Sequence, residues 1–148
     1  MDQVKLALQR FNVNPTLLKL ELTEGLLLHD VDQAIDTMNT LCKVGVRFSL
    51  DDFGTGYSSL QYLKKLPLEQ IKIDQSFVRD IANDEIDKSI VRTIIAMAVT
   101  MELNVIAEGV ETEEQRQILL RQGCSNFQGY FFGKPVPIEH FEEALLNV

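Results

Sequence analysis

Short stretches with alternating apolar and polar residues recur along this chain, separated by longer stretches with an apolar residue every three or four positions. Alternation is typical of a β-strand, and the longer spacing is typical of an amphipathic helix. The alternating stretches predict strands at residues 18–23, 46–51, 70–74, 104–107 and 125–128. The others predict helices at residues 2–11, 31–42, 58–64, 86–101 and 112–122, and a final helix after Pro137. A regular alternation of strands and helices indicates a parallel α/β protein.

Residues that start or stop helices support two of these assignments. Thr112 and Gln115 have the spacing of a capping box, and Gly123 follows the end of the same helix. Pro137 suits the first turn of the final helix, where the apolar spacing predicts that Phe141, Ala144 and Leu145 face inward.

Each predicted strand has one apolar side and one polar side. The polar positions include Glu21, Asp51 and Lys72, all close to the carboxyl ends of their strands. A doubly wound sheet is covered by helices on both faces, so its strands are apolar on both sides. A barrel accounts for the pattern better, because inward residues line an interior that opens at a polar mouth. We therefore expect an α/β fold that is a partial TIM-like (β/α)8 barrel with about five βα units.

Acidic residues gather where the predicted strands end: Glu21, Glu24, Asp51, Asp52, Asp74, Glu108 and Glu111, accompanied by Lys72 and Gln128. Any one of them could be a solvated or helix-capping residue, Glu24 and Glu111 above all. Together, at four successive strand ends, they would repel one another unless protonated or bound to cations. Carboxylate oxygens suit Mg²⁺ or Mn²⁺. The adjacent Asp51 and Asp52 could bridge two ions in a phosphoester-hydrolysing site, with Lys72 balancing charge.

A glycine-rich segment follows the aspartate pair. Gly54 and Gly56 lie between a predicted strand and a predicted helix, where a glycine backbone can approach a phosphate closely. The segment lacks the Lys-Ser/Thr ending of a P-loop, so the glycines could equally serve the geometry of the loop alone.

Composition narrows the class of protein. The chain has 148 residues, 45% of them hydrophobic and 24% charged, which is typical of a globular domain. Its formal net charge of −8 argues against binding DNA or RNA through phosphates. We expect no membrane segment, because no apolar run approaches about 20 residues. Cys42 and Cys124 are far apart and predict reduced thiols in a cytoplasmic protein.

Six stretches together resemble one family: ELTE at 21–24, LDDFGTGYSSL at 50–60, IKID at 71–74, AEGVE at 107–111, QGY at 128–130 and KP at 134–135. In order and spacing they are similar to the EAL domain of bacterial cyclic di-GMP phosphodiesterases. The resemblance implies hydrolysis of cyclic di-GMP to linear pGpG by two divalent ions, Mg²⁺ or Mn²⁺, on a modified (β/α)8 barrel.

The resemblance also implies a role for individual residues. Glu21, Asp51 and Asp52 would be metal ligands, with Asp51 bridging both ions. Lys72 would orient the attacking water or the phosphate, Glu108 would be the general base or a metal-linked acid, and Gln128 would belong to the metal and water network. The remaining matches are Asp74 and Pro135 near the nucleotide, Glu24 and Glu111 as supports of the site, and Gly54 and Gly56 in the supported loop.

One departure from the family pattern is large. The first two strands, with the Glu-Ala-Leu metal ligand that names the family, have no counterpart, and Glu143-Ala144-Leu145 is a chance match in the last helix. Residues 1–148 are therefore expected to be the C-terminal part of an EAL domain. We expect weakened metal binding and turnover, and open strand edges that favour a homodimer or larger assembly. A non-catalytic cyclic di-GMP-binding or interaction module and a barrel fragment without a ligand remain alternatives.

Overall fold

The computed structural model describes residues 2–23, 25, 31–56 and 60–146, and for Ala144 the backbone alone. Glu24, which was expected to hold the glycine loop, lies outside the described residues, as do residues 57–59 of that loop. No helix in the described part of the chain combines the length and the apolar composition that a bilayer crossing needs.

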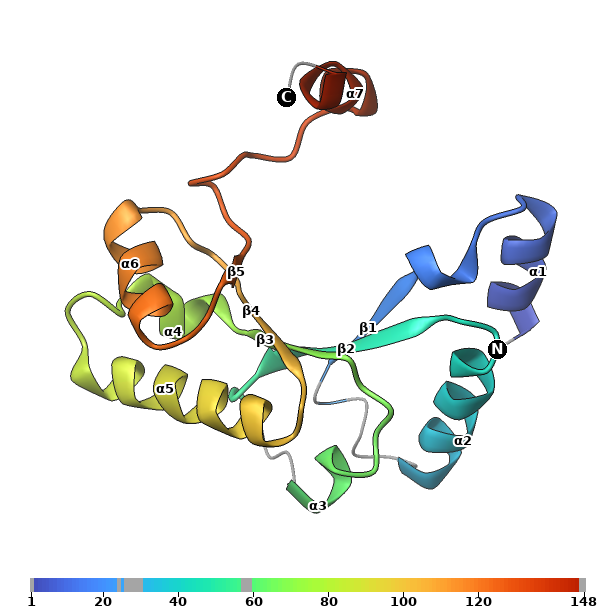
Figure 1. Ribbon diagram of the computed structural model, residues 1–148, viewed down its shortest axis with the longest axis horizontal. Helices are drawn as coiled ribbons and strands as arrows, with labels where there is room; N and C mark the ends of the chain where they lie inside the picture. Colours follow the sequence, from blue (N-terminus) through green and yellow to red (C-terminus); the bar gives the residue numbers. More distant parts are fainter. Residues whose placement is uncertain (1, 24, 26–30, 57–59, 147–148) are drawn as a thin grey trace.

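Five parallel strands form a single sheet (Figure 1). They are β1 (Lys19–Thr23), β2 (Arg47–Phe53), β3 (Gln70–Ile73), β4 (Asn104–Ala107) and β5 (Asn126–Phe127). Their order in space is β1-β2-β3-β4-β5, the order of the sequence. A doubly wound sheet reverses its direction at a central strand, whereas a barrel adds each strand beside the previous one. The strand order therefore confirms the partial barrel with about five βα units.

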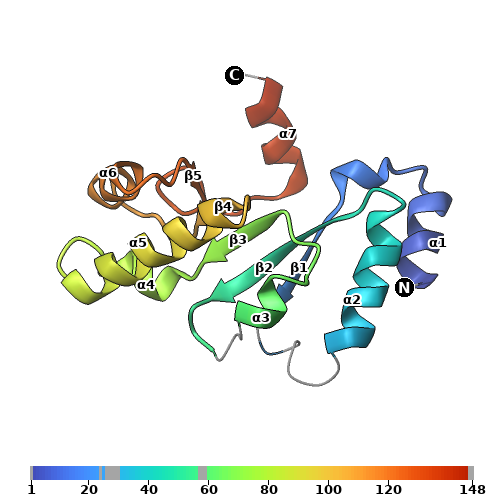
Figure 2. The same ribbon diagram turned by 60° about the horizontal axis from the view of Figure 1, so that its bottom comes forward.

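The helices follow the strands as the apolar spacing predicted, with one addition. They are α1 (Asp2–Arg10), α2 (Val31–Cys42), α3 (Leu60–Leu63), α4 (Gln75–Arg79), α5 (Glu85–Thr100), α6 (Glu113–Arg121) and α7 (Ile138–Leu146), with a 3₁₀ turn, η1, at Pro15–Leu17. Helices α2, α3 and α5 lie along the same side of the sheet (Figures 1 and 2). The short α4 was not predicted, because its five residues are too few to show a periodic pattern.

The two faces of the sheet differ in polarity, as the alternation predicted. Leu50, Ile71 and Ile73 lie on the helix-covered face and have no exposed surface. On the opposite face Arg47 Nη1 lies 3.1 Å from Glu69 Oε1. Burial of apolar side chains beneath the helices stabilises the fold by about 1.5–3 kcal/mol for each large side chain. The polar face is thereby left to line the interior.

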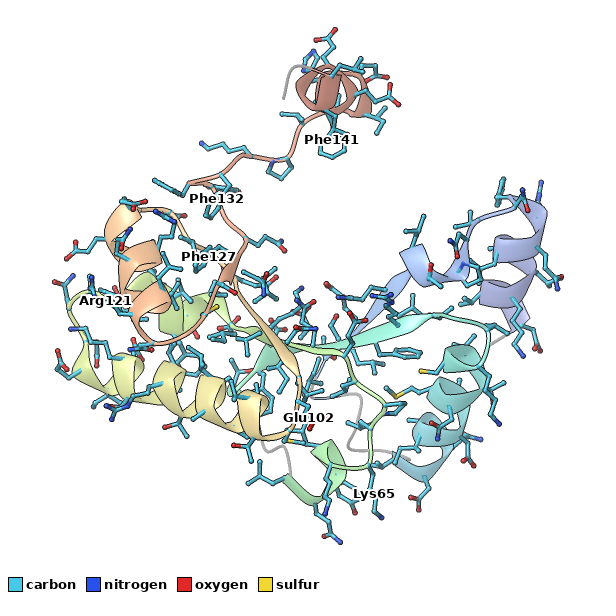
Figure 3. The ribbon with its side chains drawn as sticks, in the orientation of Figure 1. Lys65, Glu102, Arg121, Phe127, Phe132 and Phe141 are labelled. Atoms are coloured by element: carbon cyan, nitrogen blue, oxygen red, sulfur yellow. The ribbon has the colours of Figure 1, made fainter. Side chains whose placement is uncertain are left out.

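The orientation predicted for the last helix is wrong. Phe141 and Leu145 were expected to face inward, but they are 51% and 60% exposed. An extended segment after β5 carries α7 away from the sheet, and Figure 3 shows Phe141 on this outlying helix. The spacing of apolar residues identifies the apolar side of a helix, but it does not identify the surface that this side meets.

Helix α6 offers a matched test of this packing. Leu119 is completely buried, whereas its neighbour Leu120 is 37% exposed. We expect Leu119→Ala to lower the free energy of unfolding by about 3 kcal/mol, since it leaves a cavity in the core, and Leu120→Ala to lower it by less than about 1 kcal/mol. Urea titration of both variants measures the difference. Equal losses would contradict the described packing of α6.

Candidate metal centre

Lys72 lies at the centre of a cluster of charged side chains at the carboxyl ends of the strands. Its Nζ lies 2.8 Å from Glu21 Oε2, 2.9 Å from Asp51 Oδ1 and 2.8 Å from Glu108 Oε1. These partners come from β1, from β2 and from the residue that follows β4. Parallel strands bring their carboxyl ends to one edge of the sheet, so residues far apart in sequence meet around one ammonium group.

The Lys72 side chain is only 7% exposed. Burial by itself lowers the pKa of Lys72, but the carboxylates of Glu108, Glu21 and Asp51 outweigh burial and raise this pKa above its ordinary value. Lys72 is therefore a fixed positive charge at neutral pH. Only the contact with Glu21 Oε2 is a hydrogen bond of regular geometry, and the contacts with Asp51 and Glu108 are ion pairs.

A β-bulge brings the two adjacent aspartates together. Between Leu50 and Phe53 the strand β2 has one more residue than the facing stretch of β3, and Asp52 adopts a positive φ of 53°. In a regular strand, neighbouring side chains point to opposite faces. Here one carboxylate oxygen from each of Asp51, Asp52 and Glu108 lies within 4.8 Å of the others. The left-handed conformation costs about 1–2 kcal/mol, a strain often found at functional sites.

Negative charge in this cluster is only partly balanced. Burial raises the pKa of Glu108, Asp51 and Glu21 add to the effect, and Lys72 opposes it. The pKa of Asp52 is raised by its partial burial and by the neighbouring Asp51 and Asp74. Both shifts report an arrangement in which a further positive charge would be favourable.

Asp51 has a buried oxygen that suits a cation. Among the described residues, no donor makes a hydrogen bond of regular geometry to Asp51 Oδ1, so its 2.9 Å contact with Lys72 Nζ is an ion pair only. A buried oxygen without a hydrogen-bond donor retains lone pairs for another ligand. Carboxylate oxygens are the ligands that Mg²⁺ and Mn²⁺ prefer, so the residues of this cluster have the chemistry of a divalent metal site.

The structure unites most, but not all, of the expected site residues. Glu21 was expected to be a metal ligand, and its Oε2 is engaged by Lys72. Asp74 caps α4, accepting a 3.0 Å hydrogen bond from the backbone N–H of Ser76, and lies beside Asp52. Pro135 lies exposed in the segment between β5 and α7, and within the described part of the chain it makes no hydrogen bond to the acids.

A hollow of about 280 Å³ adjoins the charged cluster. Its lining includes Glu108, Glu111 and Gln128, together with Gln75, Gly109, Gly129 and Tyr130. Glu108 thus faces both the Lys72 cluster and this hollow. Gln128 and Glu111 lie at the hollow and not among the acids around Lys72, so their predicted roles depend on what occupies it.

Two glycines at the site are required by the backbone. Gly54 has a φ of 100°, and a Cβ there would lie 3.0 Å from Phe77 Cε2. Gly109 has a φ of 69°, and a Cβ there would lie 2.6 Å from the Cβ of Gln75. Gly54 is among the site residues predicted from the sequence, whereas Gly109 and Gln75 are not. The glycine directly after Glu108 was the available signal, because a glycine at a strand end often marks a close approach of two backbones.

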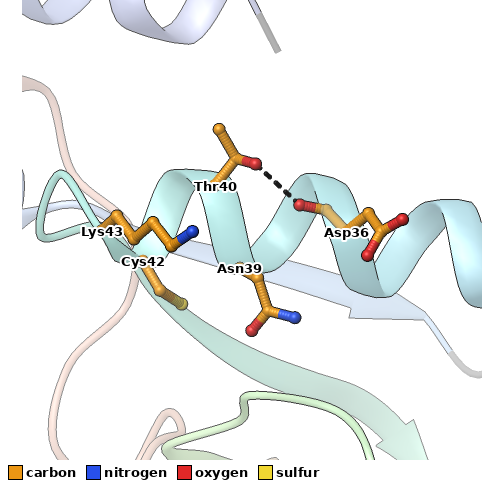
Figure 4. Close-up of a pocket in the computed structure, with 5 residues that line it drawn as sticks. All are labelled: Asp36, Asn39, Thr40, Cys42 and Lys43. Atoms are coloured by element: carbon orange, nitrogen blue, oxygen red, sulfur yellow. Dashed lines mark hydrogen bonds between the residues drawn. The ribbon is translucent and has the colours of Figure 1, made fainter.

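A larger hollow lies elsewhere, beside α2. It has a volume of about 590 Å³ and is lined by Asp36, Asn39, Thr40, Cys42 and Lys43 (Figure 4). Thr40 Oγ1 donates a 2.9 Å hydrogen bond to the backbone oxygen of Asp36, as in an ordinary helix. This hollow is lined by only one carboxylate, that of Asp36, whereas several carboxylates meet around Lys72. We therefore assign the candidate metal site to the Lys72 cluster.

The family comparison agrees with the geometry. The model of the EAL domain matches residues 1–135. The chain belongs to the EAL domain family. This membership accounts for the TIM-like strand order and for the gathering of acids at the carboxyl ends of the strands.

One relative and two solved structures show what this EAL chain is similar to. The bifunctional diguanylate cyclase/cyclic di-GMP phosphodiesterase MucR of Pseudomonas aeruginosa is 45% identical over 139 residues, which are 94% of this chain and 20% of MucR. A solved PaMucR phosphodiesterase in complex with cyclic di-GMP has a TM-score of 0.90 and 45% identity, with 95% of this chain and 57% of that chain covered. A manganese and cyclic di-GMP complex of Klebsiella pneumoniae BlrP1 has a TM-score of 0.83 and 31% identity, with 90% and 34% covered. The EAL chain thus spans about a fifth of MucR and just over half of the solved PaMucR chain.

The raised pKa of Glu108 predicts how stability depends on pH. Folding favours the protonated carboxyl group, so its stabilisation is present below the unfolded-state pKa of about 4.3 and is lost as pH rises through the higher folded-state pKa. At pH 7.5 the ionised group therefore opposes folding. We expect metal-free Glu108→Gln to be more stable than the parent at pH 7.5, with a smaller difference at pH 4, in chemical denaturation.

Glu113 is the control with the opposite sign. Its pKa is lowered to about 2 by hydrogen bonds from Arg116 and Gln117. Its ionised form therefore favours folding, and Glu113→Gln should gain no stability at pH 7.5. A Glu108→Gln variant that is less stable than the parent at this pH would contradict the described electrostatics.

Proposed function

We propose that this chain acts as a metal-dependent phosphodiesterase that hydrolyses cyclic di-GMP to linear pGpG, with two divalent ions, Mg²⁺ or Mn²⁺. The single observation that carries the proposal is the cluster of Asp51, Asp52 and Glu108 oxygens beside the buried ammonium of Lys72. Support comes from MucR, which is named a cyclic di-GMP phosphodiesterase, and from BlrP1, whose complex contains manganese and cyclic di-GMP.

Acidic side chains of this chain would hold the metal. We assign Asp51 as the shared ligand because its Oδ1 is buried and accepts no regular hydrogen bond from the described residues. Asp52 and Glu21 would complete the set from either side, Asp52 through the bulge and Glu21 through β1. When bound, divalent ions would polarise the phosphate and lower the pKa of a water molecule.

Lys72 would position the phosphate or the attacking water. Its Nζ lies within 2.9 Å of three carboxylates but makes a hydrogen bond of regular geometry only to Glu21 Oε2 among the described residues, so N–H groups remain for a contact with substrate. Its fixed charge also reduces the repulsion that a dinucleotide with two anionic phosphodiesters meets at an acidic cluster. Lys72 would thus contribute both position and charge.

Glu108 would act as the general base or as a metal-linked acid. Its raised pKa brings its proton affinity closer to that of a base working near neutral pH. Its side chain is 17% exposed and lies on the hollow that Gln128 also lines, so a water molecule there would be within its reach. Asp74 and Pro135 are proposed to lie near the nucleotide, and Glu111 to support the site.

Substitution of the shared ligand tests the proposal. We expect Asp51→Asn to lower the rate of pGpG release by about 100-fold or more and to weaken Mn²⁺ binding, because one anionic ligand of both ions is lost. Chromatography of the products and calorimetry with Mn²⁺ measure the two effects. Asp36→Asn, which changes an aspartate on α2 in the other hollow, should change neither.

The same experiment separates the alternative functions. If the chain binds cyclic di-GMP but does not cleave it in the presence of Mn²⁺, it is a non-catalytic binding module and not a phosphodiesterase. An Asp51→Asn variant with unchanged activity and unchanged Mn²⁺ affinity would refute the metal assignment.

We also propose that the chain forms a homodimer or a larger assembly. Support comes from the outer strands, because in the described sheet β1 pairs only with β2 and β5 pairs only with β4. Unpaired strand edges readily accept another chain. The free thiols of Cys42 and Cys124 are compatible with the expected cytoplasmic location, which stays a prediction.

Light scattering coupled to size-exclusion chromatography tests the assembly. We expect a mass of at least twice the 16.8 kDa of the chain at micromolar concentration. A single stable species of monomer mass across the accessible concentrations would contradict it.

A further inference from the structure

Gln115 lies in the first turn of α6 and connects three parts of the structure. Its Oε1 accepts hydrogen bonds from the backbone N–H groups of Glu111 at 2.8 Å and Thr112 at 3.0 Å. Its Nε2 donates a 3.1 Å hydrogen bond to the backbone oxygen of Arg79, the last residue of α4. The residue is only 7% exposed, so these hydrogen bonds are shielded from water.

The backbone from Glu108 to Thr112 is fixed at successive points. The Glu108 N–H donates to Ile73 O at 3.1 Å, and the Val110 N–H donates to Gln128 O at 3.0 Å. Gly109 packs so closely on Gln75 that it leaves no room for a Cβ. Gln115 secures the far end of this segment. This segment therefore joins the Glu108 backbone to an anchor in α6.

Helix α4 connects the same anchor to the aspartates. Its last residue, Arg79, accepts the hydrogen bond from Gln115, and its N-cap, Asp74, lies beside Asp52. A helix of five residues is a stiff spacer of about 7.5 Å. Gln115 thus contacts both the segment that carries Glu108 and the helix that reaches Asp52.

We propose that Gln115 is a positioning residue that holds Glu108 at a fixed separation from Asp51 and Asp52; this inference rests on the proposed metal-dependent function. Gln115 does not line the hollow beside Glu108 but lines a neighbouring one with Asp74 and Glu111, and its side-chain hydrogen bonds go to Glu111, Thr112 and Arg79. The capping box with Thr112 would stabilise α6 by itself. The bond to Arg79 O adds nothing to that cap, and its role is to tie α4 to the Glu108 segment.

Two substitutions separate the hydrogen bonds that Gln115 makes at the start of α6 from its hydrogen bond to Arg79 O. Gln115→Glu keeps an acceptor for the Glu111 and Thr112 N–H groups but cannot donate to Arg79 O when ionised. Gln115→Met has a similar length and removes all the side-chain hydrogen bonds. Gln122, the C-cap of α6, provides the matched control. Its Nε2 donates a 3.2 Å hydrogen bond to the backbone oxygen of Lys88 in α5, at the opposite end of α6 from Gln115.

Mn²⁺ affinity measured by calorimetry, with the melting temperature and kcat recorded on the same samples, is the decisive measurement. We expect Gln115→Glu and Gln115→Met to weaken Mn²⁺ binding by about 10-fold or more, as the loss of a residue that orients a metal ligand does. Gln122→Glu and Gln122→Met should lower the melting temperature comparably and leave Mn²⁺ affinity within about twofold.

The outcomes are distinct. Unchanged Mn²⁺ affinity in a folded Gln115→Glu variant, or an equal loss in the Gln122 variants, would overturn the proposal. If Gln115→Met does not fold, the two Glu variants decide by themselves. A parent chain that binds Mn²⁺ but releases no pGpG would refute the proposed hydrolysis, while the affinity comparison would still decide the role of Gln115.

Discussion

The attraction between the buried Lys72 ammonium and its three carboxylates is the interaction on which the candidate site depends. Two like charges 4 Å apart repel by about 4 kcal/mol at the effective dielectric of a protein surface, so Glu21, Asp51 and Glu108 need a shared cation to converge. Lys72 provides one positive charge against three negative ones. Burial raises the pKa of Glu108, and the neighbouring Asp51 and Glu21 add to this shift.

Sheet topology makes this convergence possible. In sequential parallel winding every strand ends at the same edge, so one polar residue per strand end is enough to build a cluster. The bulge at Asp52 adds a second carboxylate from β2, at the cost of a strained backbone. Behind the acids, Gln115 joins α6 to α4 and to the Glu108 segment. The site therefore consists of the acids at the strand ends and of the hydrogen bonds of Gln115 that hold the neighbouring backbone.

Sequence patterns predicted much of the site. Alternation along β1, β2 and β3 placed Glu21, Asp51 and Lys72 on one face, and the structure brings all three together. The same alternation assigns Asp52 to the opposite face, so it could not reveal the bulge that brings Asp52 toward Glu108. Gln115 was predicted correctly as half of a capping box, but its bond to Arg79 O crosses 36 positions of sequence and leaves no local pattern.

The sequence alone determined the order of strands and helices, the polar and apolar faces of each strand, and the family motifs, because these depend on residues within a few positions of one another. Tertiary structure decided the rest: the Asp52 conformation, the distances between Lys72 and its carboxylates, the hydrogen bond from Gln115 to Arg79 O, and the outlying position of α7. These features depend on contacts between segments distant in sequence. Such contacts are set by packing and charge in three dimensions, so periodicity along the chain does not encode them.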